Sequence, residues 1–203
     1  MKLTAMFENA LDDLMKRIRG VLVVVNNEHQ GAGAGVLAGD GLVLTNNHVA
    51  GDGHALEVTL DDGGPYKAKV IKRKVDADLA LLQISDHGHA GAIFSTQEPR
   101  PGEMVFAYGH PWGQRNVLTG GILSAVTTAR TRRGELTILR SDVQLAPGNS
   151  GGPLLNAAGE VLGLNAMILG GDQSVAIPAS VIREFLAEAH KNMPRSKAPE
   201  DVL

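Results

Sequence analysis

The sequence has no cysteine among its 203 residues. This excludes a disulfide-stapled scaffold, a zinc site built on thiolates and a cysteine nucleophile. An excess of positive charge is also missing, because 19 lysine and arginine residues face 22 aspartate and glutamate residues. Binding of nucleic acid through a broadly basic surface is therefore not expected. A chain of this length buries roughly 70% of its extended surface and needs no cross-links to fold.

Long apolar runs are missing as well. The run Val21–Val25 near the start is far shorter than the ~20 apolar residues that span a bilayer. Glu8, Asp12 and Asp13 interrupt the segment before it, which therefore lacks the continuous apolar region of a signal peptide. We expect no membrane insertion from these residues.

Aromatic residues are scarce, at 3% of the chain, whereas glycine is abundant, with 25 residues. Short apolar runs separated by turn residues fill the middle of the sequence and are typical of β-strands. Two groups of about six such runs, joined by an irregular proline-containing stretch, indicate two packed antiparallel β-barrels rather than an alternating α/β sheet. The predicted class is therefore all-β.

Helical periodicity occurs only near the two ends. Leu11, Leu14 and Ile18 share one helical face near the start, and Ile182 and Phe185 do so near the end. We predict an N-terminal helical segment at residues 1–20, a first β-barrel at 21–98, a second β-barrel with the C-terminal helix at 99–190, and a flexible tail at 191–203.

The sharpest chemical signal is the segment Pro147–Pro153, which reads PGNSGGP. A serine hydroxyl becomes a nucleophile when a base takes its proton, and the oxyanion that then forms needs hydrogen-bond donors. Glycines let the chain turn tightly, so the N–H groups of Gly148 and Ser150 can point into one small space. The alternative is a Gly-Asn turn with an incidental serine.

The same segment fits the G-x-S-x-G nucleophile elbow of α/β-hydrolases, in which an acid and then a histidine follow the serine. The only histidine after Ser150 is His190, on the predicted last helix. The residues between them are too few for the remaining strands of such a sheet. We therefore reject this interpretation.

Better partners precede the serine. His48 follows the apolar run Leu42–Thr45, and Asp78 begins the run Leu79–Ile84. Histidine exchanges protons near neutral pH, and a buried carboxylate fixes its tautomer and stabilises the imidazolium. Taken singly, His48 reads as a capping residue and Asp78 as a turn residue. In the order His48, Asp78, Ser150 they match chymotrypsin-like enzymes.

These motifs resemble the HtrA (Deg) group of trypsin-like serine proteases. The resemblance rests on TNNHV, DADLALLQI and PGNSGGPLLN…GEVLGLN, with GHPWG, TGGILSA and VAIP as secondary blocks. It implies two six-stranded chymotrypsin-like barrels with the site between them. It also implies that His48 is the base, Asp78 its orienting acid and Ser150 the nucleophile of an acyl-enzyme mechanism. Gly148, Asn149 and Ser150 would form the oxyanion loop.

The sequence departs from related patterns at two positions. Asn149 stands where trypsin has an aspartate that pairs with a new N-terminus, so activation by N-terminal insertion is not expected. Ala166 replaces a hydroxyl residue usual in the family, which implies lower activity if that hydroxyl bonds the triad aspartate. Many members continue into PDZ domains, whereas this sequence stops at Leu203. The family also implies homotrimers and an extracytoplasmic location.

The same resemblance indicates which residues wall the primary specificity pocket: Leu145, Ala166, Met167 and Ile168. None is acidic, which disfavours cleavage after arginine or lysine. We expect broad cleavage after small or medium aliphatic residues of unfolded polypeptides, as in protein quality control under stress. Two alternatives stay open. These residues are simply core, or the protein binds unfolded segments like a chaperone without cutting them.

A second polar group comprises Asp86, His87 and His89 in a glycine-containing turn. Its residue types bind metals, but we interpret it as a turn rather than a metal site. Serine chemistry requires no metal or organic cofactor, and we predict none.

Overall fold

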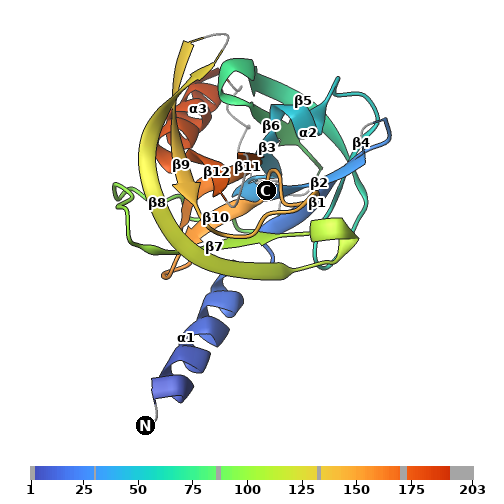
Figure 1. The fold of residues 1–203 in the computed structure, drawn as a ribbon. Coiled ribbons are helices and arrows are strands. Elements are labelled where there is room, and N and C mark those ends of the chain that lie inside the picture. Colours follow the sequence, from blue (N-terminus) through green and yellow to red (C-terminus); the bar gives the residue numbers. More distant parts are fainter. Residues whose placement is uncertain (1–2, 30, 86–87, 132–133, 170–172, 193–203) are drawn as a thin grey trace, which may run out of the picture.

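The computed structural model describes residues 3–29, 31–85, 88–131, 134–169 and 173–192. The first six strands form a closed antiparallel barrel in the order β1-β2-β3-β6-β5-β4 (Figure 1). The strands are β1 Leu22–Asn27, β2 Gly31–Gly39, β3 Leu42–Asn46, β4 Leu56–Thr59, β5 Tyr66–Lys74 and β6 Leu79–Gln83. A short helix, α2 (Asn47–Ala50), follows β3, and a 3-10 turn, η1 (Val75–Ala77), precedes β6.

The next six strands close a second antiparallel barrel in the order β10-β11-β12-β9-β8-β7. They are β7 Met104–Gly109, β8 Val117–Thr131, β9 Gly134–Ser141, β10 Pro153–Asn156, β11 Val161–Leu169 and β12 Gln173–Pro178, with the 3-10 turn η2 (Pro111–Gly113) between β7 and β8. Helices α1 (Leu3–Ile18) and α3 (Ala179–Asn192) flank the barrels. The expectation of two six-stranded antiparallel barrels with terminal helices is confirmed.

Strand β3 shows how the sequence builds two cores at once. All five of its residues are buried. Since successive side chains of a strand point to opposite faces, both faces of β3 are covered. Val43 packs inside the first barrel, whereas Leu42 and Leu44 belong to the cluster that joins the barrels. A strand buried on both faces holds the chain that follows it, α2 with His48, at a defined place.

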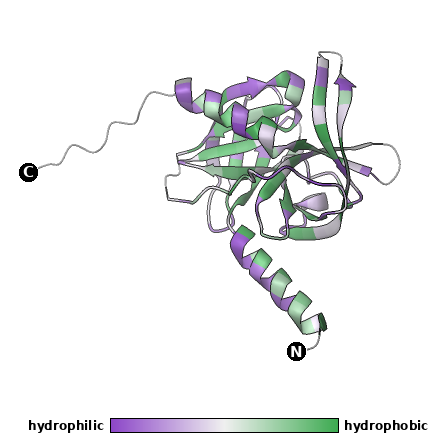
Figure 2. Cartoon of the chain, turned by 90° about the vertical axis from the view of Figure 1, so that its left-hand side faces the viewer, coloured by the Kyte–Doolittle hydropathy of each residue, from purple (hydrophilic) through white to green (hydrophobic). Residues whose placement is uncertain are grey.

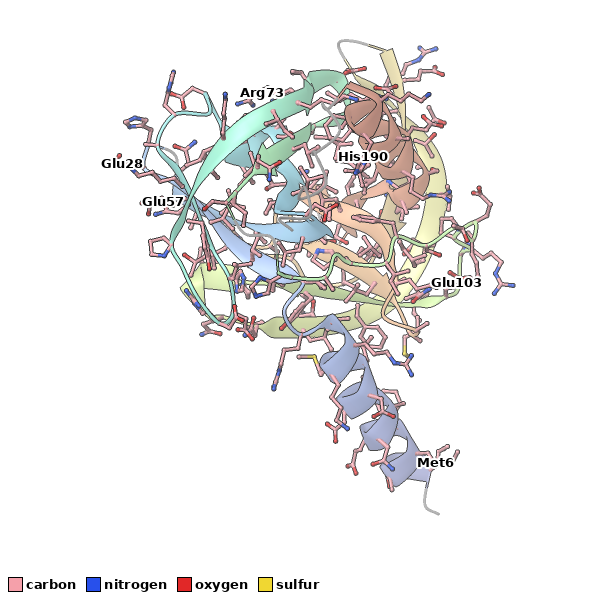
Figure 3. The ribbon with its side chains drawn as sticks, turned by 180° about the vertical axis from the view of Figure 1, so that it is seen from behind. Met6, Glu28, Glu57, Arg73, Glu103 and His190 are labelled. Carbon is pink, nitrogen blue, oxygen red and sulfur yellow. The ribbon has the colours of Figure 1, made fainter. Side chains whose placement is uncertain are left out.

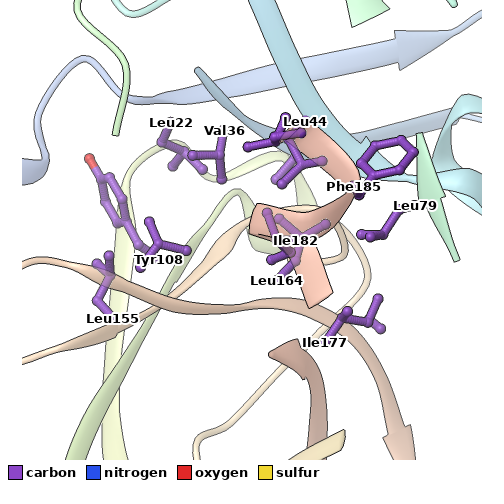
Figure 4. Packing of buried hydrophobic residues seen from close by; sticks show 14 of the residues in the cluster. Leu22, Val36, Leu44, Leu79, Tyr108, Leu155, Leu164, Ile177, Ile182 and Phe185 are labelled. Carbon is purple, nitrogen blue, oxygen red and sulfur yellow. The ribbon is translucent and has the colours of Figure 1, made fainter. Parts of the chain in front are cut away.

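The core between the barrels draws residues from every part of the fold. Leu44 and Leu79 of the first barrel pack with Leu164 and Ile177 of the second, and Phe185 of α3 joins them (Figure 4). These side chains are almost fully buried, and burying each contributes about 1.5–3 kcal/mol. The barrels are therefore packed directly against each other.

Helix α1 packs against the body through its C-terminal half, from Leu11 onward. Leu14 and Ile18 are buried, whereas Leu3, Met6 and Phe7 are exposed. The helix projects from the barrels, with Met6 near its free end (Figures 1 and 3). Figure 2 shows apolar and polar residues mixed along it. None of the helices in the described ranges is long and apolar enough to cross a membrane.

The four-segment division drawn from the sequence stays a prediction. Residues 193–203 of the tail lie outside the described residues, and α3 includes Lys191 and Asn192. Phe94 makes an isolated bridge to Val161 of β11, so the stretch near the predicted boundary pairs with the second barrel.

Candidate active site

His48 and Asp78 form a two-point contact at one end of the first barrel. The imidazole Nδ1 lies 2.7 Å from Asp78 Oδ2. The backbone N–H of His48 donates to Asp78 Oδ1 at 2.9 Å. Both carboxylate oxygens therefore bind the same residue, which fixes the ring orientation and directs the other ring nitrogen away from Asp78. The imidazole side chain is 50% exposed and the carboxylate 25%, so the ring is accessible from solvent.

The backbone of Asp78 is held in an uncommon conformation. Its φ of 53° and ψ of 41° lie in the left-handed region, directly after η1, where non-glycine residues are rare. The carbonyl of Asp78 accepts hydrogen bonds from Asn46 Nδ2 at 3.1 Å and from Asn47 N–H at 3.0 Å. These contacts hold the turn against β3 and present the carboxylate to His48.

The loop that carries Ser150 is anchored to both barrels. The Ser150 carbonyl accepts a hydrogen bond from the N–H of Ala34 in β2 at 2.8 Å, and Gly151 N–H donates to Asn165 O of β11 at 2.9 Å. A methyl group built on Gly33 would lie 2.7 Å from Val49 Cγ1 and 3.2 Å from the Ser150 carbonyl oxygen. Helix α2 and the serine loop therefore meet at the same point of β2.

The side chain of Ser150 points toward the second barrel. Its hydroxyl donates to the carbonyl of Ala166 at 3.0 Å. Within the described part of the chain, no hydrogen bond joins this hydroxyl to His48. Catalytic hydrogen bonds of this kind are often long in unliganded enzymes and form with substrate. A rotation about χ1 of Ser150 frees the hydroxyl from Ala166.

The N–H groups of the predicted oxyanion loop differ in whether a backbone carbonyl accepts their hydrogen bond. Asn149 N–H donates to Ala146 O at 3.0 Å, within the turn. Among the described residues, no backbone carbonyl accepts from Gly148 N–H or Ser150 N–H. The carbonyl of Pro147 accepts from Trp112 N–H at 2.9 Å. Since the two ends of a peptide group point in opposite directions, the N–H of Gly148 is directed away from Trp112.

A second loop, Gly109–Gly113, supports this arrangement and was not singled out as functional from the sequence. A Cβ on Gly148 would collide with His110 O, and one on Gly109 would collide with the side chain of Asn149. The sequence signal that marks this loop is GHPWG, which entered only as a secondary block of the family resemblance.

His110 in that loop is buried. Its Nδ1 accepts the N–H of Asn116 at 3.3 Å, and within the described residues its Nε2 has no hydrogen-bond partner. Burial lowers the pKa of His110 from 6.5 to about 4, and the positive charge of Arg115 adds to this. His110 is therefore neutral at neutral pH and does not share the role assigned to His48.

The residues predicted to wall a specificity pocket are only partly described. Leu145 lines a cavity of about 430 Å³ beside the serine loop, together with Ala146 and Asn149. Ala166 is buried and does not line that cavity. The side chains of Met167 and Ile168 lie outside the described residues, although their backbone belongs to β11.

The other histidine candidates lie elsewhere. His190 is on α3, where its Nδ1 contacts Leu186 O at 2.8 Å (Figure 3). His89 pairs with Asp62 at 3.0 Å, whereas Asp86 and His87 lie outside the described residues. No cluster of histidine and acidic residues suited to a metal occurs in the described ranges.

Two closed barrels with a histidine–aspartate pair and a glycine-flanked serine at their junction define a chymotrypsin-like serine protease domain. The family model described as a trypsin-like peptidase domain matches residues 33–164. The chain therefore belongs to the trypsin-like peptidase family, and relatives to which it is similar are HtrA-type serine proteases. Serine protease HTRA1 of Xenopus laevis is 38% identical over 161 residues, which cover 76% of this chain and 35% of that protein.

A bacterial relative is equally similar. The "Probable periplasmic serine endoprotease DegP-like" of Pseudomonas fluorescens is 38% identical over 161 residues, 76% of this chain and 34% of that protein. The crystal structure of the serine endoprotease from Yersinia pestis matches with a TM-score of 0.78 and 27% identity, over 89% of this chain and 66% of that one. The chain thus spans about a third of the length of the curated relatives it matches.

Proposed function

We propose that this chain is a serine endopeptidase that cleaves polypeptides through an acyl-enzyme intermediate. His48 is the general base, Asp78 orients it and Ser150 is the nucleophile. The observation that carries the proposal is the two-point contact of Asp78 with His48. Next to it lies a serine loop whose Gly148 and Ser150 N–H groups donate to no backbone carbonyl in the described residues.

The reaction follows from these positions. Ser150 Oγ leaves the Ala166 carbonyl, gives its proton to His48 Nε2 and bonds to the carbonyl carbon of the substrate. The negative charge on the former carbonyl oxygen is stabilised by Gly148 N–H and Ser150 N–H. Asp78 stabilises the imidazolium, which then protonates the leaving amine as the peptide bond breaks. Water, deprotonated by His48, hydrolyses the ester and restores Ser150.

The proposed substrates are polypeptides that expose their aliphatic side chains only when they are unfolded. We infer that Leu145, Ala166, Met167 and Ile168 receive a small or medium aliphatic side chain before the scissile bond. Apolar pockets separate side chains that differ by a methylene only about 10–200-fold, so cleavage is broad. Unfolded polypeptides are therefore the proposed substrates, and protein quality control under stress is the proposed role.

A decisive test compares the protein with its Ser150→Ala variant on casein. Loss of the nucleophile lowers turnover by roughly 10⁶-fold in such a triad, so the variant leaves casein intact. Equal degradation by both proteins indicates a contaminant and contradicts the assignment. Labelling of Ser150 by a fluorophosphonate provides the second readout, and His48→Ala abolishes it if His48 is the base.

The second candidate is a chaperone-like protein that uses the same site region to bind unfolded segments without cleavage. The observation behind it is Ala166, at a position where the family resemblance implies a hydroxyl residue. Among the described side chains and backbone groups, only His48 donates to the Asp78 carboxylate. Casein that is bound but left uncut by the unmodified protein supports this candidate and overturns the first.

We also propose a homotrimer, as the family resemblance implies. Leu3, Met6 and Phe7 expose apolar side chains on the projecting part of α1. These side chains support a contact with another copy of the chain. Size-exclusion chromatography with light scattering measures the mass directly. A monomer at all concentrations contradicts the trimer and leaves the proposed activity untouched.

A further inference from the structure

Helix α2, which carries His48, is too short to be stable by itself. It has only four residues, Asn47–Ala50, whereas helices shorter than about 12 residues are marginal in water without tertiary contacts. In the described part of the chain, Asn46 before the helix makes no side-chain capping bond to it. The position of the imidazole therefore depends on contacts from the rest of the first barrel.

Two side chains hold α2, one at each end. At the C-terminal end, Nδ2 of the buried Asn27 in β1 donates to Ala50 O at 3.1 Å. At the N-terminal end, beside His48, Arg73 Nη1 donates to Asn47 Oδ1 at 2.6 Å. Arg73 lies on β5 (Figure 3), the strand that leads into η1. The helix with the proposed base is thus bonded to the segment that leads to its acid.

Asn47 completes a closed set of bonds around the turn η1. Its N–H donates to Asp78 O at 3.0 Å, and its side-chain oxygen accepts from Arg73. Arg73 and Asp78 lie at the two ends of the short segment that contains η1, so both ends of this segment are bonded to the same residue of α2. A movement of His48 away from the Asp78 carboxylate strains one of these bonds.

The guanidinium of Arg73 is committed to this contact. Within the described residues, Asn47 is its only hydrogen-bond acceptor and no carboxylate pairs with it. Its other terminal nitrogen packs over the turn after α2, where a Cβ on Gly53 would lie 2.9 Å from Nη2. Hydrogen bonds from a charged donor are roughly twice as strong as neutral ones. The side chain therefore holds α2 and does not serve a surface ion pair.

We propose that Arg73 is a positioning residue for the reaction, which keeps the imidazole of His48 aligned with Asp78 by holding Asn47. The inference rests on the proposed endopeptidase function, in which Asp78 fixes the tautomer of His48. A displacement near 1 Å at a catalytic group lowers turnover about 100-fold. Loss of one of several bonds that hold α2 should have a smaller effect.

The kinetic test replaces the charged donor. Arg73→Met removes the guanidinium but keeps an aliphatic chain, and we expect kcat on a p-nitroanilide substrate to fall roughly tenfold at unchanged KM. Active-site titration counts the competent molecules, so that loss of folded protein is not mistaken for loss of kcat. Arg73→Lys, which keeps a charged donor, should recover most of kcat. Lys69→Met is the matched control, since Lys69 is an exposed cation on the same strand, and it should leave kcat unchanged.

A double-mutant cycle tests whether Arg73 acts through Asn47. Asn47→Ala removes the acceptor and should lower kcat by a similar factor. Combined with Arg73→Met it should cause little further loss, because residues that act through one contact have non-additive effects. Losses that multiply in the double variant would overturn the inference. A higher KM with unchanged kcat in Arg73→Met would assign Arg73 to substrate binding and overturn it as well.

The tautomer of His48 provides a readout that needs no turnover. Long-range proton–nitrogen NMR spectra of an imidazole show which ring nitrogen carries the proton. In the Ser150→Ala protein, neutral His48 should carry it on Nδ1, which faces Asp78. Addition of Arg73→Met should give a mixture of tautomers, whereas addition of Lys69→Met should not. An unchanged tautomer ratio with Arg73→Met would contradict the positioning role.

These readouts separate the inference from the function on which it rests. Absence of Ser150-dependent p-nitroanilide hydrolysis in the unmodified protein defeats the proposed function, whereas the tautomer ratio still decides whether Arg73 positions His48. Hydrolysis that is present and unaffected by Arg73→Met leaves the proposed function standing and overturns the inference.

Discussion

The N–H of Ala34 in the first barrel binds the carbonyl of Ser150 in the second at 2.8 Å. This contact joins β2 of the first barrel to the proposed nucleophile itself. Gly151, the next residue, has a φ of 86°, and a Cβ at this position would collide with Ala34 O. Thr45 Oγ1, which donates to Ala34 O at 2.7 Å, closes the remaining space. The serine is therefore positioned by both barrels.

The first prediction concerns this junction. Gly151→Ala should lower turnover by about 100-fold or more, because a displacement near 1 Å at a catalytic group has that effect. Turnover on a p-nitroanilide measures it, with active-site titration to count competent molecules. Gly102→Ala is the control, since Gly102 has a φ of 92° and open space around it. If both variants lost the same turnover, backbone strain alone would explain the effect, and the contact of Gly151 with Ala34 would not be needed.

The second prediction concerns the two acidic residues before β6. Asp78→Asn should keep the fold but lower kcat by roughly 10⁴-fold, because the amide favours the wrong tautomer of His48. Asp76→Asn should leave kcat unchanged, because Asp76 is exposed and belongs to η1. Both rates are measured on one p-nitroanilide substrate. A large effect of Asp76→Asn would contradict the assignment of the orienting acid.

The third prediction concerns stability and pH. Burial lowers the pKa of His110 to about 4 in the folded protein, compared with 6.5 as its ordinary value. Between these values the unfolded chain binds more protons, so the free energy of unfolding falls as the pH falls from 6.5 toward 4. The loss approaches about 3 kcal/mol from this residue and is absent above that window.

Urea unfolding at several pH values measures this dependence. His110→Asn does not titrate in this range and offers an oxygen acceptor to the N–H of Asn116. The variant should therefore show a flatter pH dependence between 4 and 6.5. An identical slope in both proteins would show that His110 does not remain neutral in the folded state.

The fourth prediction concerns the attachment of α3 to the first barrel. Lys72 Nζ on β5 donates to Phe185 O at 3.0 Å and to Glu188 Oε2 at 2.9 Å. It also lies 4.8 Å from the centre of the Phe185 ring. Lys72→Ala should lower the free energy of unfolding by about 1–2 kcal/mol, because it removes a charged donor and a cation–π contact.

Lys69 offers the comparison for this residue, since it lies on the same strand and is exposed. Lys69→Ala should change the free energy of unfolding by less than about 0.5 kcal/mol. Thermal or urea unfolding of both variants measures the difference. Equal effects of the two substitutions would mean that Lys72 does not hold α3 in solution.

Much of this architecture was predictable from local patterns. Alternating apolar residues and glycine-containing turns indicate short strands, since strand periodicity and turn chemistry are properties of a few neighbouring residues. The types and order of His48, Asp78 and Ser150 indicate serine chemistry in the same way. The short helix α2 and the left-handed turn at Asp78 were not predicted, because contacts with β3 stabilise them.

The sequence by itself therefore determined the strand content, the all-β class and the residue types available for catalysis. Only the tertiary structure decided which donors of the serine loop are used within the turn, how Trp112 binds Pro147, and that Ala34 holds Ser150. The bonds of Trp112 to Pro147 and of Ala34 to Ser150 join residues far apart in the chain. Their geometry depends on how the two barrels pack, and no local pattern of residues specifies that packing.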